Sequence, residues 1–474
     1  MFKTAIGFIP SNWDAWDGNS ETGRWAGGMR DRCVAVMEQI PGLDLVVPSR
    51  EMTGDGCVSS VEQARKVLEF FRARNIQGLI VGNMTFGMEV AVGTILSGLS
   101  RETPVLHFCT RSGPSGAAGN RSTDTWCGQF MTVSAIKRRG FTYSHIPTCN
   151  PEESAFRAGL ETFVRAVCAI SRFRGARLGQ IGTRPMLFES QGWDEQDLQR
   201  RFGQMVVPMD LDTAFSRIDA IAPDSAEVKA KVAEIRASAD EVGDVHTAAS
   251  LINQARYELA LIVIARELEV QAMAVSCWTR LQERFGISAC STFGRLNQQG
   301  VITACEVDLL GAATMWAVHC ATLGRVVPDF IDWTDLHPTE KNVWLAWHCG
   351  NAAPCLAADG STKRIIRNER MIQWCPNCHG AMEFALKPGP VTCSRLVEYG
   401  GEYTFFFGTG EVVEIEPKIR GAYGWVKVKD LTDWETKMVE HGVIHHGTLI
   451  HDPKVADALE LFCKYLGIRA VRGA

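Results

Sequence analysis

Short apolar runs alternate with segments of helical periodicity over the first third of the chain. The runs have the length and composition of strands that are buried on both faces of a parallel sheet. They lie at residues 4–9, 43–47, 78–82 and 104–108. Before the third run, Ser59 opens a segment with the spacing of a helix start, and apolar residues follow at helical period. This alternation predicts a doubly wound α/β domain over residues 1–173.

A second segment of the same kind follows, and the pattern then changes. Over residues 174–335, helical segments separate strand-like runs at 178–182, 270–277 and 301–306. From residue 336 onward, Gly and Pro turns separate short strand-like pieces at 384–386, 403–407, 412–415 and 425–428. The predicted fold class is therefore α/β, with two doubly wound α/β domains followed by a β-rich, barrel-like C-terminal domain of residues 336–474.

Charge and hydropathy exclude two classes of partner. The chain has 49 Lys and Arg against 54 Asp and Glu, a net charge of −5, so it lacks the positive excess that grips a nucleic-acid backbone. A membrane span needs about 18 to 20 uncharged apolar residues, and the most apolar stretch, 259–277, contains Arg266, Glu267 and Glu269. We therefore expect no nucleic-acid partner and no membrane segment.

The start of the chain and the cysteines suggest a location. Residues 1–13 contain one Lys and a short apolar run ending at Pro10, which is typical of a first strand and not of a signal peptide. The 16 cysteines are scattered among apolar runs without the regular spacing of a disulfide framework. Both features predict a reducing, cytoplasmic environment, with most thiols acting as small buried hydrophobes.

Polar side chains at the ends of apolar strands are the candidates for chemistry. Glu306 directly follows an apolar strand, where burial of a carboxylate costs several kcal/mol unless a cation pairs with it. Asp332 and His348 end two later strand-like runs. Because the ends of adjacent strands in an open α/β sheet converge on one crevice, we expect these three side chains to face the same point.

The C-terminal region adds the pair His445-His446, in an apolar setting just before the last helix. Two carboxylates with two imidazoles form a mixed oxygen and nitrogen donor set. Such a set suits Mn²⁺, Co²⁺ or Mg²⁺ better than a cation that prefers thiolates. The sequence therefore predicts a divalent metal site, with Mn²⁺ as the first choice.

These residues resemble the L-arabinose isomerase and L-fucose isomerase superfamily of aldose-ketose isomerases. The resemblance rests on the order Glu306, Asp332, His348 and a late His-His pair before the last helix. It extends to the helix that ends in Gln298-Gln299-Gly300 and to the loop at 386–392, which is similar to one in fucose isomerase-like proteins.

The resemblance implies roles for these residues. Glu306, Asp332, His348 and His446 would be the metal ligands, Glu306 and Asp332 would also be the acid/base pair, and His445 would face the substrate. The Asp at position 332 resembles the pattern of fucose isomerases, whereas the strand-end His at position 348 resembles the pattern of arabinose isomerases. The superfamily also implies a homo-oligomer, as a hexamer.

The activity implied is conversion of an aldose to a ketose through a cis-enediol intermediate. The substrate class is a hexose or pentose, with terminally modified or anionic sugars among the candidates. Trp278 and Met186 lie where such isomerases contact the sugar. Asn83 and Trp13 follow strands of the N-terminal sheet and are further candidates for substrate binding.

Several alternatives remain open. The chain could be a non-catalytic sugar-binding or regulatory protein, or it could catalyse another enediolate reaction, such as epimerisation or aldol cleavage. Asp308, Asp329 and Asp335 lie near the predicted ligands, and we interpret them as loop or cap residues. Cys375 and Cys378 have the spacing of half a zinc site, but a tight turn in a β-hairpin is the favoured interpretation.

Overall fold

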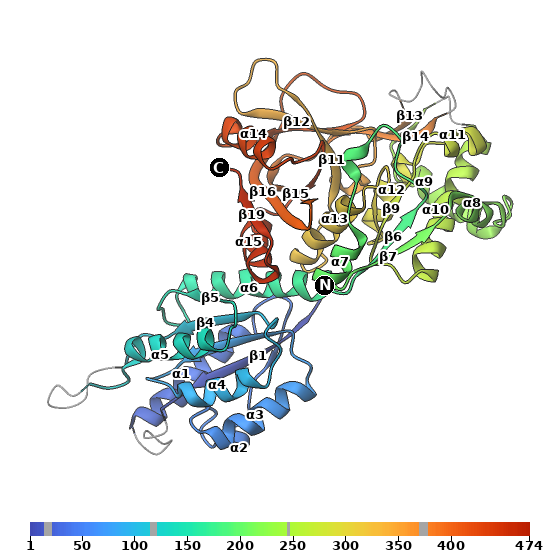
Figure 1. The fold of residues 1–474 in the computed structure, drawn as a ribbon. Helices are drawn as coiled ribbons and strands as arrows, with labels where there is room; N and C mark the ends of the chain where they lie inside the picture. The colour runs from blue at the N-terminus through green and yellow to red at the C-terminus, as the bar shows by residue number, and fades with distance from the viewer. Residues whose placement is uncertain (14–20, 114–120, 244–246, 369–377) are drawn as a thin grey trace. The chain divides into compact units, whose positions relative to one another are not determined.

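The structure is a computed structural model that describes residues 1–13, 21–113, 121–243, 247–368 and 378–474. The chain divides into two compact units (Figure 1). Unit 1 comprises Met1–Ser171 with Glu460–Gly467, and unit 2 comprises Arg172–Leu459 with Ile468–Ala474. Across the described residues, no helix combines the length and the apolar character needed to cross a membrane.

Unit 1 is built on a five-stranded parallel sheet with the order β2-β1-β3-β4-β5. Four of these strands match the predicted apolar runs. The strands are β1 (Thr4–Ser11), β2 (Leu43–Val46), β3 (Gly78–Asn83), β4 (Val105–Cys109) and β5 (Tyr143–Ile146). All six residues of β3, the middle strand, are buried, as expected for a strand covered on both faces.

Helices connect the parallel strands of unit 1. They are α1 (Glu21–Met37), α2 (Arg50–Thr53), α3 (Val61–Ala73), α4 (Glu89–Ser97), α5 (Thr125–Arg138) and α6 (Ser154–Phe173). The predicted helix start is present, with Ser60 as the N-cap of α3: its hydroxyl accepts the Gln63 amide at 3.2 Å. The Gln63 side chain in turn accepts the Ser59 amide at 2.8 Å, so two amides near the helix start have partners.

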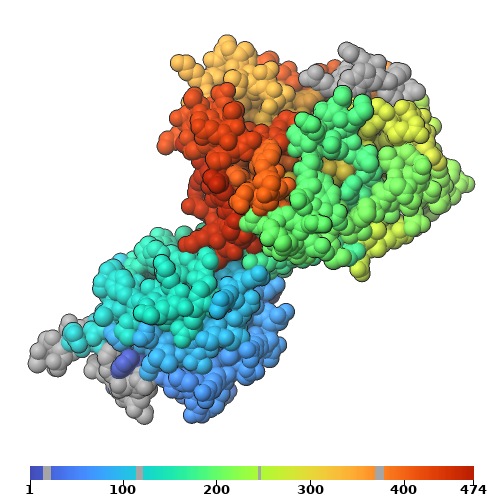
Figure 2. Space-filling model, in the orientation of Figure 1, coloured from blue at the N-terminus to red at the C-terminus, as the bar shows by residue number. Residues whose placement is uncertain are grey.

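Unit 2 begins with a four-stranded parallel sheet of order β10-β9-β6-β7. Its strands are β6 (Arg177–Ile181), β7 (Met205–Met209), β9 (Ala272–Val275) and β10 (Ile302–Ala304). Its helices are α7 (Glu195–Phe202), α8 (Leu211–Asp219), α9 (Ala226–Ala237), α10 (Ala248–Glu267), α11 (Arg280–Phe285), α12 (Cys290–Gln298) and α13 (Leu309–Ala321). All thirteen residues of α13 are buried. The green segment that contains α8 and α9 lies at the surface in Figure 2.

Six antiparallel strands then close into a barrel, in the ring order β16-β15-β18-β11-β12-β17 and back to β16. They are β11 (Asp329–Leu336), β12 (Val343–His348), β15 (Gly389–Tyr399), β16 (Glu402–Val413), β17 (Ala422–Lys427) and β18 (His446–Ile450). The strands β8 (Glu241–Val242), β13 (Arg364–Arg367), β14 (His379–Ala385) and β19 (Arg469–Arg472) extend this sheet. The predicted fold class, two parallel α/β layers followed by a β-rich barrel, is confirmed; the domain limits at 173 and 335 stay a prediction.

One expectation about the barrel is wrong. Residues 403–407 and 412–415 were expected to form two strands separated by a turn, but β16 runs without interruption from Glu402 to Val413. The two glycines between these segments allow close packing instead of a turn. A Cβ on Gly408 would lie 2.3 Å from the Trp434 ring, and a Cβ on Gly410 would lie 2.9 Å from the Lys427 carbonyl oxygen.

Trp434 fills one part of the barrel core. It is buried on α14 (Leu431–Glu440) and contacts the rings of Trp333, Trp344 and Phe406, with centroid separations of 5.3 to 6.5 Å. The last helix is α15 (Val455–Leu466), and the short 3₁₀ turns η2 (Glu189–Gln191) and η3 (Pro354–Leu356) follow β6 and β12.

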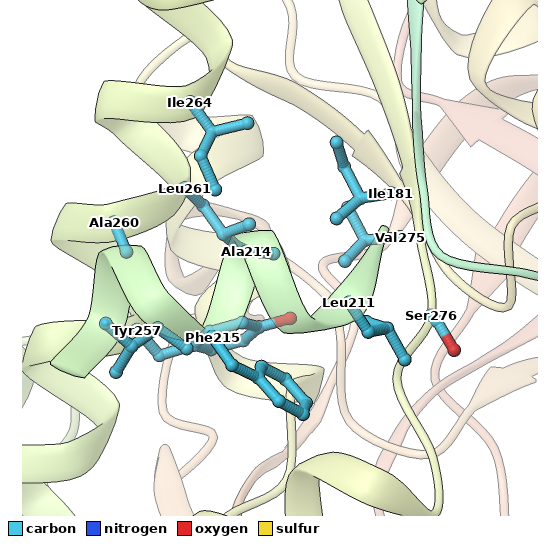
Figure 3. Close-up of a pocket in the computed structure, with 11 residues that line it drawn as sticks. Ile181, Leu211, Ala214, Phe215, Tyr257, Ala260, Leu261, Ile264, Val275 and Ser276 are labelled. Carbon is cyan, nitrogen blue, oxygen red and sulfur yellow. The ribbon is translucent and has the colours of Figure 1, made fainter. Parts of the chain in front are cut away.

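A small apolar cavity of about 10 Å³ lies in unit 2 between α8, α10 and the strands β6 and β9. Figure 3 shows Leu261 and Ile264 of α10 facing Ile181 and Val275 across it. Tyr257 also lines the cavity, and its buried hydroxyl finds no hydrogen-bond partner among the described residues. An unsatisfied hydroxyl in an apolar environment destabilises the folded state.

We therefore expect Tyr257→Phe to raise the free energy of unfolding by about 1 kcal/mol, because it removes an unsatisfied group and keeps the ring. Urea unfolding of the full chain measures this change. Tyr465→Phe is the matched control, and we expect it to lower the free energy of unfolding. The Tyr465 hydroxyl has partners within unit 1: it lies 2.7 Å from the Val105 carbonyl oxygen and accepts the Ser144 amide at 3.0 Å. Loss of stability in Tyr257→Phe would contradict the argument.

Candidate active site

Glu306 lies in the tight connection between β10 and α13. The strand ends at Ala304, earlier than predicted, and Glu306 and Val307 both have φ of 57°. Two consecutive non-glycine residues in the left-handed region store backbone strain, which is largest for a β-branched side chain. Such strain is typical of functional sites, where the surrounding structure holds one side chain in a fixed place.

Three side chains approach the Glu306 carboxylate. Nε1 of Trp278 donates to Oε1 at 3.2 Å, Nε2 of Gln191 donates to Oε2 at 3.4 Å, and Nε2 of His446 lies 3.3 Å from Oε2. Burial disfavours the charged carboxylate, but the hydrogen bond to His446 and the positive charge there outweigh burial and lower the pKa of Glu306. Glu306 is therefore held as an anion.

Asp332 reaches the same imidazole from the barrel. Strands β11 and β18 pair so that Asp332 is directly opposite His446, and Oδ1 of Asp332 lies 3.6 Å from Nε2 of His446. This oxygen is buried and has no hydrogen-bond donor in the parts of the chain that the structure describes. We expected these side chains to meet at the ends of adjacent strands of one open sheet. Instead, Glu306 follows a strand of the parallel sheet, whereas Asp332, His348 and His446 lie on barrel strands.

His446 is held in one orientation by a buried ion pair. Its Nδ1 lies 2.9 Å from Oδ2 of Asp308, so the ring donates there and directs Nε2 toward Glu306 and Asp332. Asp308 also pairs with the Arg395 guanidinium, whose Nη2 donates to Oδ1 at 2.9 Å, and both side chains are almost fully buried. Burial opposes ionisation of Asp308, but the charges of Arg395 and His446 outweigh it and lower the pKa of Asp308.

The same contacts act on His446 itself. Burial disfavours the imidazolium, but the hydrogen bonds to Asp308 and Glu306 outweigh burial and raise the pKa of His446 to about 9. A histidine that donates Nδ1–H to a carboxylate and presents Nε2 to further carboxylates has the arrangement of a metal-ligating imidazole.

His348 is buried close to this group, 6.0 Å from His446 between ring centroids. Burial lowers the pKa of His348, so the ring is neutral. Its Nδ1 accepts the Cys349 amide at 2.8 Å. In that tautomer the ring proton is on Nε2, so Nε2 becomes a metal ligand only after it loses this proton.

The predicted substrate contacts of unit 2 lie in different surroundings. His445 is exposed, and its ring packs 5.3 Å from that of Phe188, which also contacts Trp278 at 6.0 Å. Met186 lies two residues before Phe188 in the loop after β6 and is 89% exposed. Phe188, and not Met186, is the side chain with which this loop contacts Trp278 and His445.

Asn83 and Trp13 belong to unit 1. Asn83 ends β3, and its side chain is occupied by the His107 ring at 3.0 Å and by the Phe86 carbonyl oxygen at 3.0 Å. Trp13 follows β1, and its ring packs edge-on against Phe86 at 5.1 Å. The four groups Glu306, Asp332, His348 and His446 are all in unit 2.

Sequence reasoning missed two residues of the site. Asp308 is the N-cap of α13, as interpreted, but the same carboxylate also orients His446. Arg395, on β15, neutralises the charge of the Asp308 carboxylate. A signal was present, since Arg395 is the one charged residue of the segment 389–397, but its partner is distant in sequence.

The other candidates set aside in the sequence analysis lie elsewhere. Asp329 and Asp335 both lie in β11, so their interpretation as loop or cap residues is wrong. Oδ1 of Asp335 accepts the Leu336 amide. Cys378 lies at the start of β14, which pairs antiparallel with β13, and its thiol donates to the Asn368 carbonyl oxygen. Cys375 lies outside the described residues, so the choice between a hairpin turn and a zinc site stays open.

Two family models match this chain. The model described as "Fucose/sulfoquinovose isomerase, N-terminal domain" matches residues 24–174, and the model described as "L-fucose isomerase, C-terminal domain" matches residues 346–472. The chain belongs to the fucose/sulfoquinovose isomerase family. The resemblance expected from Glu306, Asp332, His348 and His446 is thereby confirmed at the level of the family.

Curated relatives support the assignment of this chain to the family. A protein named sulfoquinovose isomerase from Alkalicoccus urumqiensis is 26% identical over 73% of this chain and 76% of its own length. Another of that name, from Priestia aryabhattai, is 23% identical over 85% of this chain and 87% of its own length. The protein is therefore an enzyme, an aldose-ketose isomerase of this family.

The residues of this isomerase fit a divalent cation. Two groups of side chains have donor atoms within 4.8 Å of one another, Glu306 with His445 and His446, and Asp332 with His348 and His446. The buried Oδ1 of Asp332, which lacks a hydrogen-bond donor among the described residues, is an acceptor that a cation would satisfy. Carboxylate oxygens and imidazole nitrogens suit a hard or borderline divalent ion.

We expect Gly311→Ala to weaken metal binding by the isomerase by about 10- to 100-fold, because orienting groups behind a ligand have effects of that size. A Cβ on Gly311 would lie 2.7 Å from Oδ2 of Asp308, the atom that holds His446. Calorimetric titration with Mn²⁺ measures the effect. Gly28→Ala is the control, since a Cβ there meets nothing within 4 Å in the described structure. Unchanged Mn²⁺ affinity in Gly311→Ala would disprove the link.

Proposed function

We propose that this isomerase interconverts an aldose and a ketose of the terminally modified, anionic hexose class, with sulfoquinovose as the first candidate. The observation that carries the proposal is the approach of Glu306 and Asp332 to the same nitrogen of His446, at 3.3 Å and 3.6 Å. The names of the relatives support the choice of a sulfonated sugar. Other hexoses and pentoses are the comparison substrates.

Glu306, Asp332, His348 and His446 are the proposed metal ligands, and Mn²⁺ is the proposed ion, with Co²⁺ or Mg²⁺ as alternatives. When bound, a divalent cation polarises the sugar carbonyl and stabilises negative charge that develops on the substrate oxygens. Glu306 and Asp332 present carboxylate oxygens to the centre of the group, and His446 presents Nε2, which must lose its proton to bind a metal. His348 differs, because its Nδ1 is occupied by the Cys349 amide.

Glu306 and Asp332 are proposed to move the substrate protons. Isomerisation removes a proton from the carbon next to the carbonyl and returns it to the neighbouring carbon, through a cis-enediol. Glu306 is ionised and receives hydrogen bonds from Trp278 and Gln191, which fix its orientation for proton abstraction. Asp332, which has one oxygen free of hydrogen bonds to described residues, is proposed to exchange the second proton.

Substrate binding is proposed for five further residues. His445 and Trp278 flank the carboxylate group in unit 2 and pack on either side of Phe188. Met186 lies on the same loop as Phe188 and, with its side chain exposed, is available to a ligand. For Asn83 and Trp13, both in unit 1, a substrate-binding role stays a prediction.

Proton NMR in D₂O tests the proposed function. The purified protein with Mn²⁺ is incubated with sulfoquinovose, glucose, fucose and arabinose, and loss of the C2 proton and appearance of ketose signals are followed. We expect metal-dependent exchange and ketose formation with sulfoquinovose, at a rate well above that with the uncharged sugars. Ketose from an uncharged sugar alone would overturn the anionic substrate class.

The same experiment separates the alternatives. A C2 epimer without ketose indicates an epimerase, and a three-carbon product indicates aldol cleavage. Sugar binding without any exchange in the presence of bound metal indicates a sugar-binding protein and overturns the proposed reaction.

Two further predictions stay untested, a homo-oligomer in the form of a hexamer and a cytoplasmic location. Light scattering checks the oligomeric state.

A further inference from the structure

Two cysteines lie side by side next to the proposed catalytic carboxylate. Strands β9 and β10 are parallel neighbours, with Ala274 opposite Ala304, and each continues past its end into a cysteine. The sulfur atoms of Cys277 and Cys305 are 3.2 Å apart. Both residues are buried, with 6% and 2% of their surface exposed.

Glu306 completes this group. Its carboxylate and the two sulfur atoms lie within 4.8 Å of one another, the same limit within which Glu306 and His446 lie. Glu306 therefore stands between two sets of donors. One set offers oxygen and nitrogen atoms, whereas the other offers two thiols.

We propose that Cys277, Cys305 and Glu306 form a second metal site, which takes a thiophilic divalent cation such as Zn²⁺ or Cd²⁺ and draws Glu306 away from the isomerase group. Binding at this site does not depend on the proposed function; the inhibition that follows from it does.

Donor chemistry distinguishes the two sites. Thiolates prefer Zn²⁺ and Cd²⁺, whereas Mn²⁺ and Mg²⁺ prefer oxygen and nitrogen. Two sulfurs on one tetrahedral zinc lie about 3.7 Å apart, given Zn–S bonds of about 2.3 Å, so the pair must open by about half an ångström. Each thiol releases its proton as the metal–sulfur bond forms, and Glu306 binds as a carboxylate, so no oxidant is required.

The neighbouring thiol of Cys290 is engaged elsewhere. Its sulfur lies 3.2 Å from the Ser288 hydroxyl and accepts from the Asn368 amide at 3.3 Å. The proposed site therefore offers two sulfurs and one carboxylate, with a fourth position left for water. That arrangement has the open position of a catalytic or regulatory zinc site and not the closed shell of a structural one.

Cadmium absorption tests the site. The full chain, loaded with Mn²⁺ and kept in a phosphine reductant, which supplies no thiol, is titrated with Cd²⁺, and the thiolate-to-cadmium band in the ultraviolet is followed. We expect a band that saturates at one equivalent and is lost in Cys277→Ser and in Cys305→Ser. The control Cys355→Ser, an exposed cysteine, keeps it. An identical band in wild type and both variants would overturn the proposal.

A second measurement needs no variant. Anomalous diffraction from crystals of the wild-type chain soaked in Cd²⁺ locates the ion directly. A peak between the sulfurs of Cys277 and Cys305 supports the site, and cadmium found only at other positions refutes it.

Inhibition is measured separately, because it rests on the isomerase activity. We expect Cd²⁺ to inhibit the Mn²⁺-loaded enzyme and Cys277→Ser to need at least a tenfold higher concentration for the same inhibition. A cadmium band in a protein without sugar exchange leaves the thiol site standing and refutes the proposed function. Sugar exchange without the band refutes the thiol site alone.

Discussion

Glu306→Gln is expected to abolish nearly all isomerase turnover and to leave the fold intact. The glutamine keeps the size of the side chain and can still accept the hydrogen bond that Trp278 donates. It loses the negative charge that faces His446 and the ability to take a proton. Loss of a general base alone lowers kcat by about 10²- to 10⁴-fold, and loss of a charged metal ligand adds to this.

Two measurements check this prediction. Turnover of the substrate that proton NMR identifies checks the loss of activity, and far-ultraviolet circular dichroism of the variant checks the fold. The matched control is Glu283→Gln, which changes an exposed glutamate on α11 that pairs with Arg280. It should keep wild-type turnover. Normal turnover and normal metal dependence in Glu306→Gln would remove this residue from the mechanism.

Asp308→Asn is expected to be the most destabilising single change at the site. Asparagine caps a helix about as well as aspartate, so the start of α13 is retained and only the charge is lost. The Arg395 guanidinium then remains buried without its ion-pair partner, which costs about 3 to 5 kcal/mol. His446 also loses its anchor, and metal affinity should fall by about 10- to 100-fold.

The double variant Asp308→Asn with Arg395→Met separates these two effects. Removal of the unpaired cation should recover most of the lost stability, whereas metal affinity should stay low because His446 is still unanchored. Urea unfolding and Mn²⁺ titration measure the two quantities. Asp430→Asn, at the exposed N-cap of α14, is the control and should change neither. Recovery of metal affinity in the double variant would show that Asp308 acts only through Arg395.

Seven of the nine strands of the two parallel sheets could be predicted because burial leaves continuous apolar runs, such as 78–82, which became β3. The edge strands β5 and β7 were missed. The two ends of β16 were predicted as separate strands, but the continuity of β16 could not be predicted, since Gly408 and Gly410 have the composition of a turn. Only the contacts with Trp434 and Lys427 explain why glycine stands there within a continuous strand.

The candidate site likewise has a part that could be predicted from the sequence and a part that could not. Glu306, Asp332 and His348 could be named from the sequence, because a polar residue that ends an apolar strand must find a partner. His446 could be named from the late His-His pair and the family resemblance. The geometry that brings Glu306 and Asp332 to Nε2 of His446 could not be predicted, because it depends on closure of the barrel, which sets Asp332 opposite His446.

The sequence by itself determined the fold class, the family resemblance and the residue types available for chemistry, since these follow from local periodicity and order along the chain. The tertiary structure alone decided that Asp308 and Arg395 orient His446, that Nδ1 of His348 is occupied by the Cys349 amide, and that two thiols lie beside Glu306. The physical reason is that hydrogen-bond direction and partner choice are fixed by atoms far apart in sequence, which no local pattern encodes.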